Sequence, residues 1–144
     1  MFMGEYHHTI DDKGRLTIPS KIREELGNDF IVTRGLDGCL FIYKKDDWNR
    51  LMNKYQSLPN VKDARNFMRF LLSGANALDF DKQGRININL PLIKYADLKK
   101  DCVIIGVGDR LEIWDKERWN NFLDANIDSF SDIADNLFKS DLNI

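Results

Sequence analysis

The pattern of apolar and polar residues predicts short strands and helices in an order that occurs twice along the chain. Strands are predicted where apolar residues alternate or cluster between turn residues, and helices where they recur every three or four positions. The first set has strands at 6–10, 15–18, 30–33 and 39–43, with helices at 21–26 and 48–55. The second has strands at 75–80, 85–88, 102–107 and 110–114, with a helix at 91–98 and another led by Asp115. An amphipathic helix at 61–72 connects the two sets.

Helix boundaries are predicted from capping residues. We expect Ser20 to cap the helix at 21–26 and Gly27 to end it, with Ile22 facing the core. Asp46 or Asp47 is expected to cap the following helix.

The repeat is clearest where residues 10–18 recur about 70 positions later as residues 80–88. Each copy predicts a hairpin, and we call residues 11–15 the first turn and residues 81–85 the second turn. Asp11 and Arg15 flank the first turn, as Asp81 and Arg85 flank the second. A glycine in each turn supplies the positive φ that a tight hairpin requires. Duplication at this spacing predicts two copies of one module.

Composition narrows the function classes. With 144 residues, 43% of them hydrophobic, the chain fits one domain or two half-size modules sharing a core. The net charge of −2 does not indicate a nucleic-acid partner, although 21 Lys and Arg residues can still form a local basic patch. Cys39 and Cys102 lie in apolar stretches and are interpreted as core residues. No secretory or membrane-spanning segment is recognised, so a cytoplasmic protein is expected.

The turns allow two interpretations. In the structural one, Asp accepts hydrogen bonds from the turn and pairs with Arg, an exposed interaction that contributes roughly 0.2–1 kcal/mol. In the functional one, Asp orients the guanidinium while basic side chains project outward. Guanidinium groups suit phosphates and guanine edges in the major groove, which admits a β-ribbon. Repetition of Asp, Gly and Arg in both turns favours the functional interpretation. The basic surface would contain Lys13, Arg15, Lys82 and Arg85, extended by Lys21, Arg23 and Lys94.

The two turns, the strand ending at Pro19, the helix starting Lys21-Ile22-Arg23 and the strand start Gly38-Cys39-Leu40 resemble the MraZ family of bacterial transcriptional regulators. The resemblance implies an α+β fold of two tandem AbrB-like swapped-hairpin β-barrel modules, an internal pseudo-dimer flanked by helices. We place the modules at 5–58 and 75–128, a connecting helix at 59–74 and an acidic C-terminal tail at 129–144.

The resemblance also implies function. The expected protein is a nucleoid-associated regulator that binds short direct repeats in double-stranded DNA upstream of its own gene and the cell-division and cell-wall gene cluster. It would form ring-shaped homo-oligomers, often octamers, with no cofactor, metal or small-molecule substrate. The expected DNA-binding residues are Asp11, Lys13, Gly14, Arg15, Arg23, Asp81, Lys82, Gly84 and Arg85.

The second turn departs from the first. Asn89 stands at the place of Pro19, and Gln83 stands at the place of Lys13. The first turn is therefore expected to contribute more to DNA binding than the second.

Two other functions fit part of the sequence. Catalysis would need His7 or His8 beside Asp11, but neighbouring strand residues face opposite sides, and no nucleophile, phosphate-loop or metal-ligand motif is present. A protein-binding, antitoxin-like module is the second alternative, suggested by the acidic tail and the apolar helices. We expect a regulator and not an enzyme.

Overall fold

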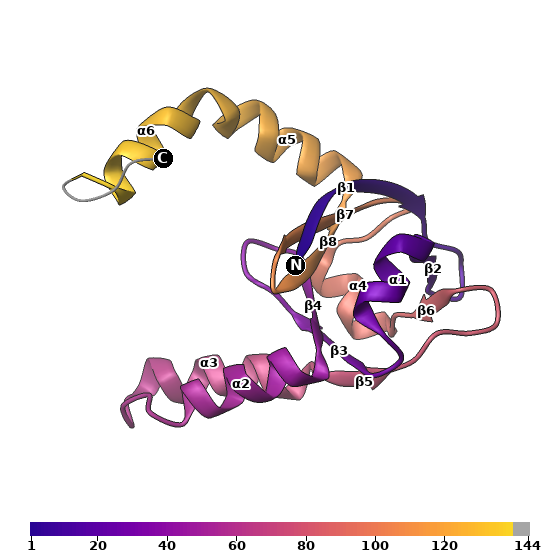
Figure 1. Cartoon of the computed structure of the whole chain (residues 1–144), viewed down its shortest axis with the longest axis horizontal. Helices are drawn as coiled ribbons and strands as arrows, with labels where there is room; N and C mark the ends of the chain where they lie inside the picture. The colour runs from indigo at the N-terminus through magenta and orange to yellow at the C-terminus, as the bar shows by residue number, and fades with distance from the viewer. Residues whose placement is uncertain (140–144) are drawn as a thin grey trace.

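Eight strands form two antiparallel sheets in residues 1–139, the part of the chain that the computed structural model describes (Figure 1). The strands are β1 (Phe2–Thr9), β2 (Arg15–Thr17), β3 (Phe30–Arg34), β4 (Leu40–Lys44), β5 (Asn76–Leu78), β6 (Arg85–Asn87), β7 (Asp101–Gly108) and β8 (Arg110–Asp115). The helices are α1 (Ser20–Leu26), α2 (Lys45–Tyr55), α3 (Lys62–Ser73), α4 (Leu90–Ala96), α5 (Lys116–Asn126), the short 3-10 helix η1 (Ile127–Ser129) and α6 (Phe130–Leu137). An α+β fold with two similar halves is therefore present.

Strands from the two halves interleave in the larger sheet. Its order is β1-β7-β8-β4-β3-β5, so β1, β4 and β3 of the first half each pair with a strand of the second half. The prediction that β1 and β2 pair as a hairpin is wrong. β1 runs along β7, and the stretch before the first turn touches β2 only through one bridge between Ile10 and Leu16.

The smaller sheet is a two-stranded ribbon of β2 and β6, one strand from each half. In its register Arg15 lies opposite Asn87, Leu16 opposite Ile86, and Thr17 opposite Arg85. We call this sheet the β2–β6 ribbon. It brings the equivalent strands of the two repeats together.

The main core lies under the ribbon and is shared by both halves. Leu16 and Ile86 are fully buried, as are Ile18 and nearly all of Ile88 just beyond the strands. This alternation follows from the period of two in a strand and leaves the intervening side chains on the outer face. A second cluster packs α2, α3 and the start of α5 on the sheet; its buried members are Cys39, Phe41, Tyr43, Trp48, Leu71 and Trp114.

The strand pairing of residues 1–139 closes no barrel, because the edge strands β1 and β5 are not paired with each other. The β-barrel expected from the resemblance is therefore not confirmed. Cys39 and Cys102 are buried free thiols, in agreement with their interpretation as core residues.

Two predicted helix caps are wrong. Ser20 is the first residue of α1, which Pro19 precedes without a side-chain cap, and α2 likewise starts one residue before Asp46. The cap of α4 is Asn89, whose Oδ1 accepts a hydrogen bond from the backbone N–H of Leu92 at 3.0 Å. Asp115 caps α5 as expected.

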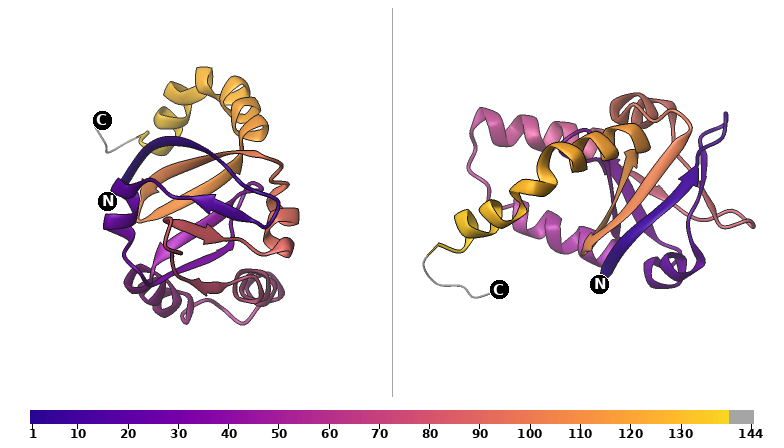
Figure 2. Two further views of the ribbon diagram at one scale, coloured as in Figure 1. Left: turned by 90° about the vertical axis from the view of Figure 1, so that its right-hand side faces the viewer. Right: turned by 90° about the horizontal axis from the view of Figure 1, so that it is seen from above.

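The helices α2, α3, α5 and α6 lie at the opposite end of the molecule from the ribbon, whereas α1 and α4 lie near it. Figure 1 and the right panel of Figure 2 show that the two turns extend from one end of the molecule. The pair α2 and α3 projects from the other end, and α5 and α6 project there separately from that pair. The predicted tail is helical as far as Leu137, and residues 140–144 lie outside the described part. Within residues 1–139 the structure has no helix with the length and apolar character that crossing a membrane requires.

Candidate nucleic-acid interface

The first turn is held by hydrogen bonds among its own residues. Asp11 Oδ1 accepts from the backbone N–H of Lys13 at 3.0 Å and of Arg15 at 2.9 Å. Asp11 Oδ2 accepts from Arg15 Nε at 2.6 Å, and the Asp11 carbonyl accepts from the Gly14 N–H at 3.0 Å. A carboxylate that accepts from both the backbone and the guanidinium fixes the turn and the arginine together.

The second turn repeats this arrangement. Asp81 Oδ1 accepts from the backbone N–H of Gln83 at 2.8 Å and of Arg85 at 3.0 Å, and Asp81 Oδ2 accepts from Arg85 Nε at 2.9 Å. In both turns the aspartate occupies the Nε edge of the guanidinium, so the terminal nitrogens are the donors left for an external acceptor.

Hydrogen bonding stabilises the ionised form of both aspartates. The backbone N–H of Arg15 is the largest cause that holds the pKa of Asp11 below its ordinary value, and the N–H of Arg85 has the same effect on the pKa of Asp81. Because both pKa values are lowered, the two groups remain carboxylates at neutral pH and keep the arginines oriented.

Backbone contacts couple the two turns. The Ile88 N–H donates to the Gly14 carbonyl at 2.8 Å, and the Ile18 N–H donates to the Gly84 carbonyl at 3.1 Å. The β2–β6 ribbon therefore continues at each end into the turn of the other half. The left panel of Figure 2 shows β2 and β6 side by side, facing the viewer.

An ion pair also crosses between the halves. Arg85 Nη1 lies 4.0 Å from Asp11 Oδ2, in addition to the bond from Arg85 Nε to its own Asp81. Asp11 thus faces the arginines of both turns. The Arg15 and Arg85 side chains are 35% and 25% exposed, which leaves part of each guanidinium open to a ligand.

The turn glycines are required by backbone conformation and by space. Gly14 has φ of 80° and Gly84 has φ of 73°. A Cβ on Gly14 would clash with the carbonyl oxygen of Ile88, whereas a Cβ on Gly84 would meet the end of the Arg23 side chain. The two turns are therefore packed by different groups.

Arg23 lies over the second turn. Its Nη1 donates to the Ile18 carbonyl at 2.5 Å, and its guanidinium covers Gly84. The equivalent position in the repeat is Ile93, whose side chain lies beside Gly14. The structure brings Arg23 to the site from α1, while Lys13 and Lys82 are exposed within the turns.

Thr17 and Asn87 share the outer face of the ribbon with the arginines and are not among the DNA-binding residues expected from the sequence. Alternation with buried Leu16 and Ile86 was the signal available, since it places Thr17 with Arg15 and Asn87 with Arg85. Pairing of β2 with β6 was needed to place Asn87 directly beside Arg15.

Among residues 1–139, no three or more His, Cys, Asp or Glu side chains gather in a way that could hold a metal ion.

These features define a protein of two similar β-rich halves whose arginine-bearing turns share one paired ribbon. A sequence model of the family described as "MraZ protein, putative antitoxin-like" matches the chain twice, over residues 1–70 and 71–141. The chain is 54% identical over 143 residues to a protein of Ligilactobacillus salivarius named "Transcriptional regulator MraZ", covering 99% of this chain and 100% of that relative. The chain belongs to the MraZ family.

Proposed function

We propose that this chain is a sequence-specific DNA-binding transcriptional regulator whose two turns contact DNA together. The observation that supports this most strongly is the pairing of β2 with β6, which places Arg15 and Arg85 on one outward face. The name of the Ligilactobacillus relative supports the same function. A regulator of this kind works in the cytoplasm, associated with the nucleoid.

The chemistry of the ribbon fits duplex DNA. A two-stranded ribbon fits the major groove, where arginine donates two hydrogen bonds to the O6 and N7 atoms of guanine. The Nε atoms of Arg15 and Arg85 are bound to aspartates, so the terminal nitrogens are the ones that approach the base or a phosphate. Lys13 and Lys82 add charge beside them. Because the whole chain carries −2, affinity depends on this local surface.

The proposed targets are short direct repeats upstream of the chain's own gene and of the cell-division and cell-wall gene cluster. The interleaved strands support a related structural proposal, in which residues 5–58 and 75–128 are tandem AbrB-like modules that act as an internal pseudo-dimer.

The test is a binding titration on the duplex upstream of the chain's own gene. Wild type is compared with Arg15→Ala, Arg85→Ala and Arg50→Ala. Arg50 serves as the control because it is 70% exposed on α2, at the opposite end of the molecule. We expect both turn variants to lose about fivefold or more in affinity, since a bidentate arginine contact contributes roughly 1–3 kcal/mol, while the control binds like wild type. Equal binding by all four proteins would refute the proposal.

Salt provides a second measurement. The logarithm of the binding constant should fall linearly with the logarithm of salt concentration, with a slope of about −0.9 for each phosphate contacted. A slope near zero would argue for a different ligand.

We also propose that the chain assembles with itself into rings, using two unlike surfaces at the helical end. One is the C-terminal arm (α5, η1 and α6), where Phe130, Ile133 and Leu137 are 67%, 49% and 69% exposed. The other is a groove of about 770 Å³ along α3 and the loop that joins it to α2, in which Leu58, Met68 and Leu72 are apolar lining residues.

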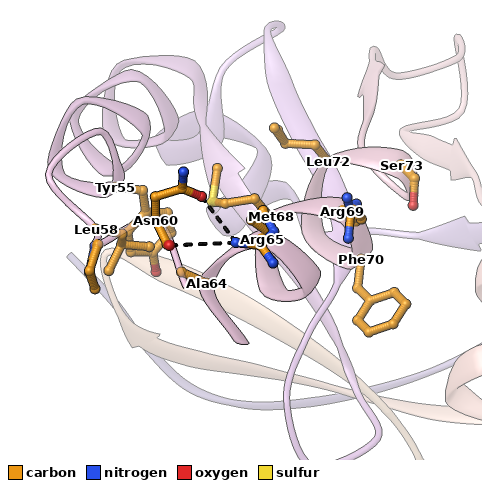
Figure 3. Close-up of a pocket in the computed structure, with 11 residues that line it drawn as sticks. Tyr55, Leu58, Asn60, Ala64, Arg65, Met68, Arg69, Phe70, Leu72 and Ser73 are labelled. Atoms are coloured by element: carbon orange, nitrogen blue, oxygen red, sulfur yellow. Dashed lines mark hydrogen bonds between the residues drawn. The ribbon is translucent and has the colours of Figure 1, made fainter. Parts of the chain in front are cut away.

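The two surfaces complement each other in charge. The arm carries Asp128, Asp132 and Asp135, whereas the groove carries Arg65 and Arg69. Figure 3 shows these arginines along the groove, with Phe70 among the residues that line it. Contact between two different surfaces of the same chain produces a ring when the rotation closes.

Light scattering tests this assembly. We expect Leu137→Asp to lower the subunit number, because it places a charge on the apolar face of the arm. Leu90→Asp is the matched control, since Leu90 is 60% exposed at the start of α4, a helix that belongs to neither surface. A wild-type monomer, or an unchanged subunit number in the arm variant, would contradict the proposal.

Protein binding is a second candidate function, favoured by the exposed apolar side chains of α6. Removing the residues after Phe130 separates the two. A DNA-binding protein keeps affinity for its operator, whereas a protein-binding module loses its partner.

A further inference from the structure

We infer that Asn87 and Thr17 read base edges beside Arg15 and Arg85. The pair Arg15–Asn87 and the pair Thr17–Arg85 then recognise different bases. This inference rests on the proposed DNA-binding function and concerns which residues give it sequence preference. Lys13 and Lys82 are not needed for it.

The register of the ribbon places the four side chains in two pairs. Asn87 lies directly opposite Arg15, and Thr17 directly opposite Arg85. Directly opposed residues on one face of an antiparallel pair have Cβ atoms about 4.5–5.5 Å apart. Each arginine therefore has a polar neighbour from the other half, close enough for both side chains to reach one base step.

Burial shows which way the four side chains face. Leu16 and Ile86 between them are fully buried, so the flanking residues point to the opposite, outer side of the ribbon. Asn87 is exposed, and Thr17 is half-buried. A ribbon that entered the major groove with this face would present all four to the base edges.

The side-chain amide of Asn87 forms no hydrogen bond within residues 1–139, although its Oδ1 lies near Gly14. Asn89, two residues later, accepts the bond that caps α4. An exposed amide with both donor and acceptor unused suits adenine, whose N6 donates to the amide oxygen and whose N7 accepts from the amide nitrogen.

Thr17 has different chemistry. Its methyl group suits the C5-methyl group of thymine, and its hydroxyl can bond to any base. The Arg15–Asn87 pair is therefore expected to prefer adenine next to guanine, and the Thr17–Arg85 pair is expected to prefer thymine next to guanine. The asymmetry lies in the strands as well as in the turns, where Gln83 replaces Lys13.

The test compares base preferences from a pool of random-sequence duplex DNA. The proteins are wild type, Asn87→Ala, Thr17→Ala, the exchange variant Thr17→Asn/Asn87→Thr, and Arg15→Ala. Asn53→Ala is the control because Asn53 is an exposed asparagine on α2, away from the ribbon. Thermal unfolding is recorded for each protein, and affinity for unrelated duplex is measured beside affinity for the selected sequence.

We expect Asn87→Ala to lose about 5- to 150-fold in preference for one base position, without change in affinity for unrelated duplex. Thr17→Ala should lose a smaller factor at a different position. The exchange variant should move the two preferences to each other's positions, a result that a purely structural role would not produce.

The outcomes distinguish a failure of this inference from a failure of the proposed function. If Arg15→Ala loses binding while Asn87→Ala and Thr17→Ala keep every base preference, this inference is overturned and the proposed function stands. If wild type selects no sequence from the pool and binds like Arg15→Ala, both fail.

Discussion

Replacing the turn glycines by alanine tests whether the two turns are packed as unequally as the structure shows. All such variants share the cost of placing a Cβ at positive φ, roughly 1–2 kcal/mol. Gly108→Ala measures this cost alone, because Gly108 has φ of 83° and no atom lies within 4 Å of its added Cβ. Gly14→Ala and Gly84→Ala add what each new methyl group meets.

At Gly14 the added methyl group meets the backbone carbonyl of Ile88, which cannot move without shifting β6. The hydrogen bond from the Ile88 N–H to the Gly14 carbonyl would be strained with it, at about 1 kcal/mol. We therefore expect Gly14→Ala to lower the free energy of unfolding by about 3 kcal/mol. At Gly84 only the flexible end of Arg23 must move, so we expect about 2 kcal/mol.

Urea denaturation at one fixed protein concentration gives these differences, because the midpoint reports stability while self-association is held constant. The same substitutions in an Arg23→Ala background test whether Arg23 causes the extra cost at Gly84. In that background, Gly84→Ala should lower the free energy of unfolding no more than Gly108→Ala does, whereas the loss caused by Gly14→Ala should not change. Equal costs for Gly14→Ala and Gly84→Ala in both backgrounds would refute the packing argument.

Three further predictions follow from caps, thiols and carboxylates. Asn89→Ala should cost about 1 kcal/mol of unfolding free energy, because it removes the cap of α4, while Ser20→Ala should stay within about 0.5 kcal/mol in the same urea assay. Burial raises the pKa of Cys102 to about 12 and that of Cys39 also well above its ordinary value, so neither thiol should react with a disulfide reagent at pH 8 until urea unfolds the chain; fast reaction in the folded state would contradict this. Because the pKa of Asp11 is lowered on folding, its stabilisation of the first turn is complete above the ordinary value of 3.8 and is lost as pH falls through the lowered pKa. The amide NMR shifts of the turn should therefore be constant at pH 5 and change only below about pH 4, and a midpoint at or above 3.8 would contradict it.

The turns could be predicted from the sequence because their hydrogen bonds are local. Every contact of Asp11 with its own turn lies within four residues, so Asp, Gly and Arg at fixed spacing specify the turn almost by themselves. Helices with an apolar stripe were predicted for the same reason. In α2, Trp48 is buried as the stripe indicated.

The partners of the strands could not be predicted in this way. A hairpin between neighbouring strands is the usual expectation, but the segments on either side of the first turn separate, and β1 pairs with β7. Which edges pair is decided by burial of apolar faces across the whole chain, and that is not a property of any local window. The same limit applies to Asn87, because its neighbour Arg15 is 72 positions away.

The interleaving of strands has a consequence for synthesis on the ribosome. β1 is made first, yet its partner β7 follows about 90 residues later, which takes about 5–20 s at ordinary elongation rates. During that interval the Phe2–Thr9 segment has no strand to pair with, and neither do the Arg15–Thr17 residues until β6 emerges. The first half therefore cannot complete its fold while it is being translated, and any surface that β1 leaves open then is accessible to chaperones. Premature termination after the first half would release a chain whose strands lack their partners.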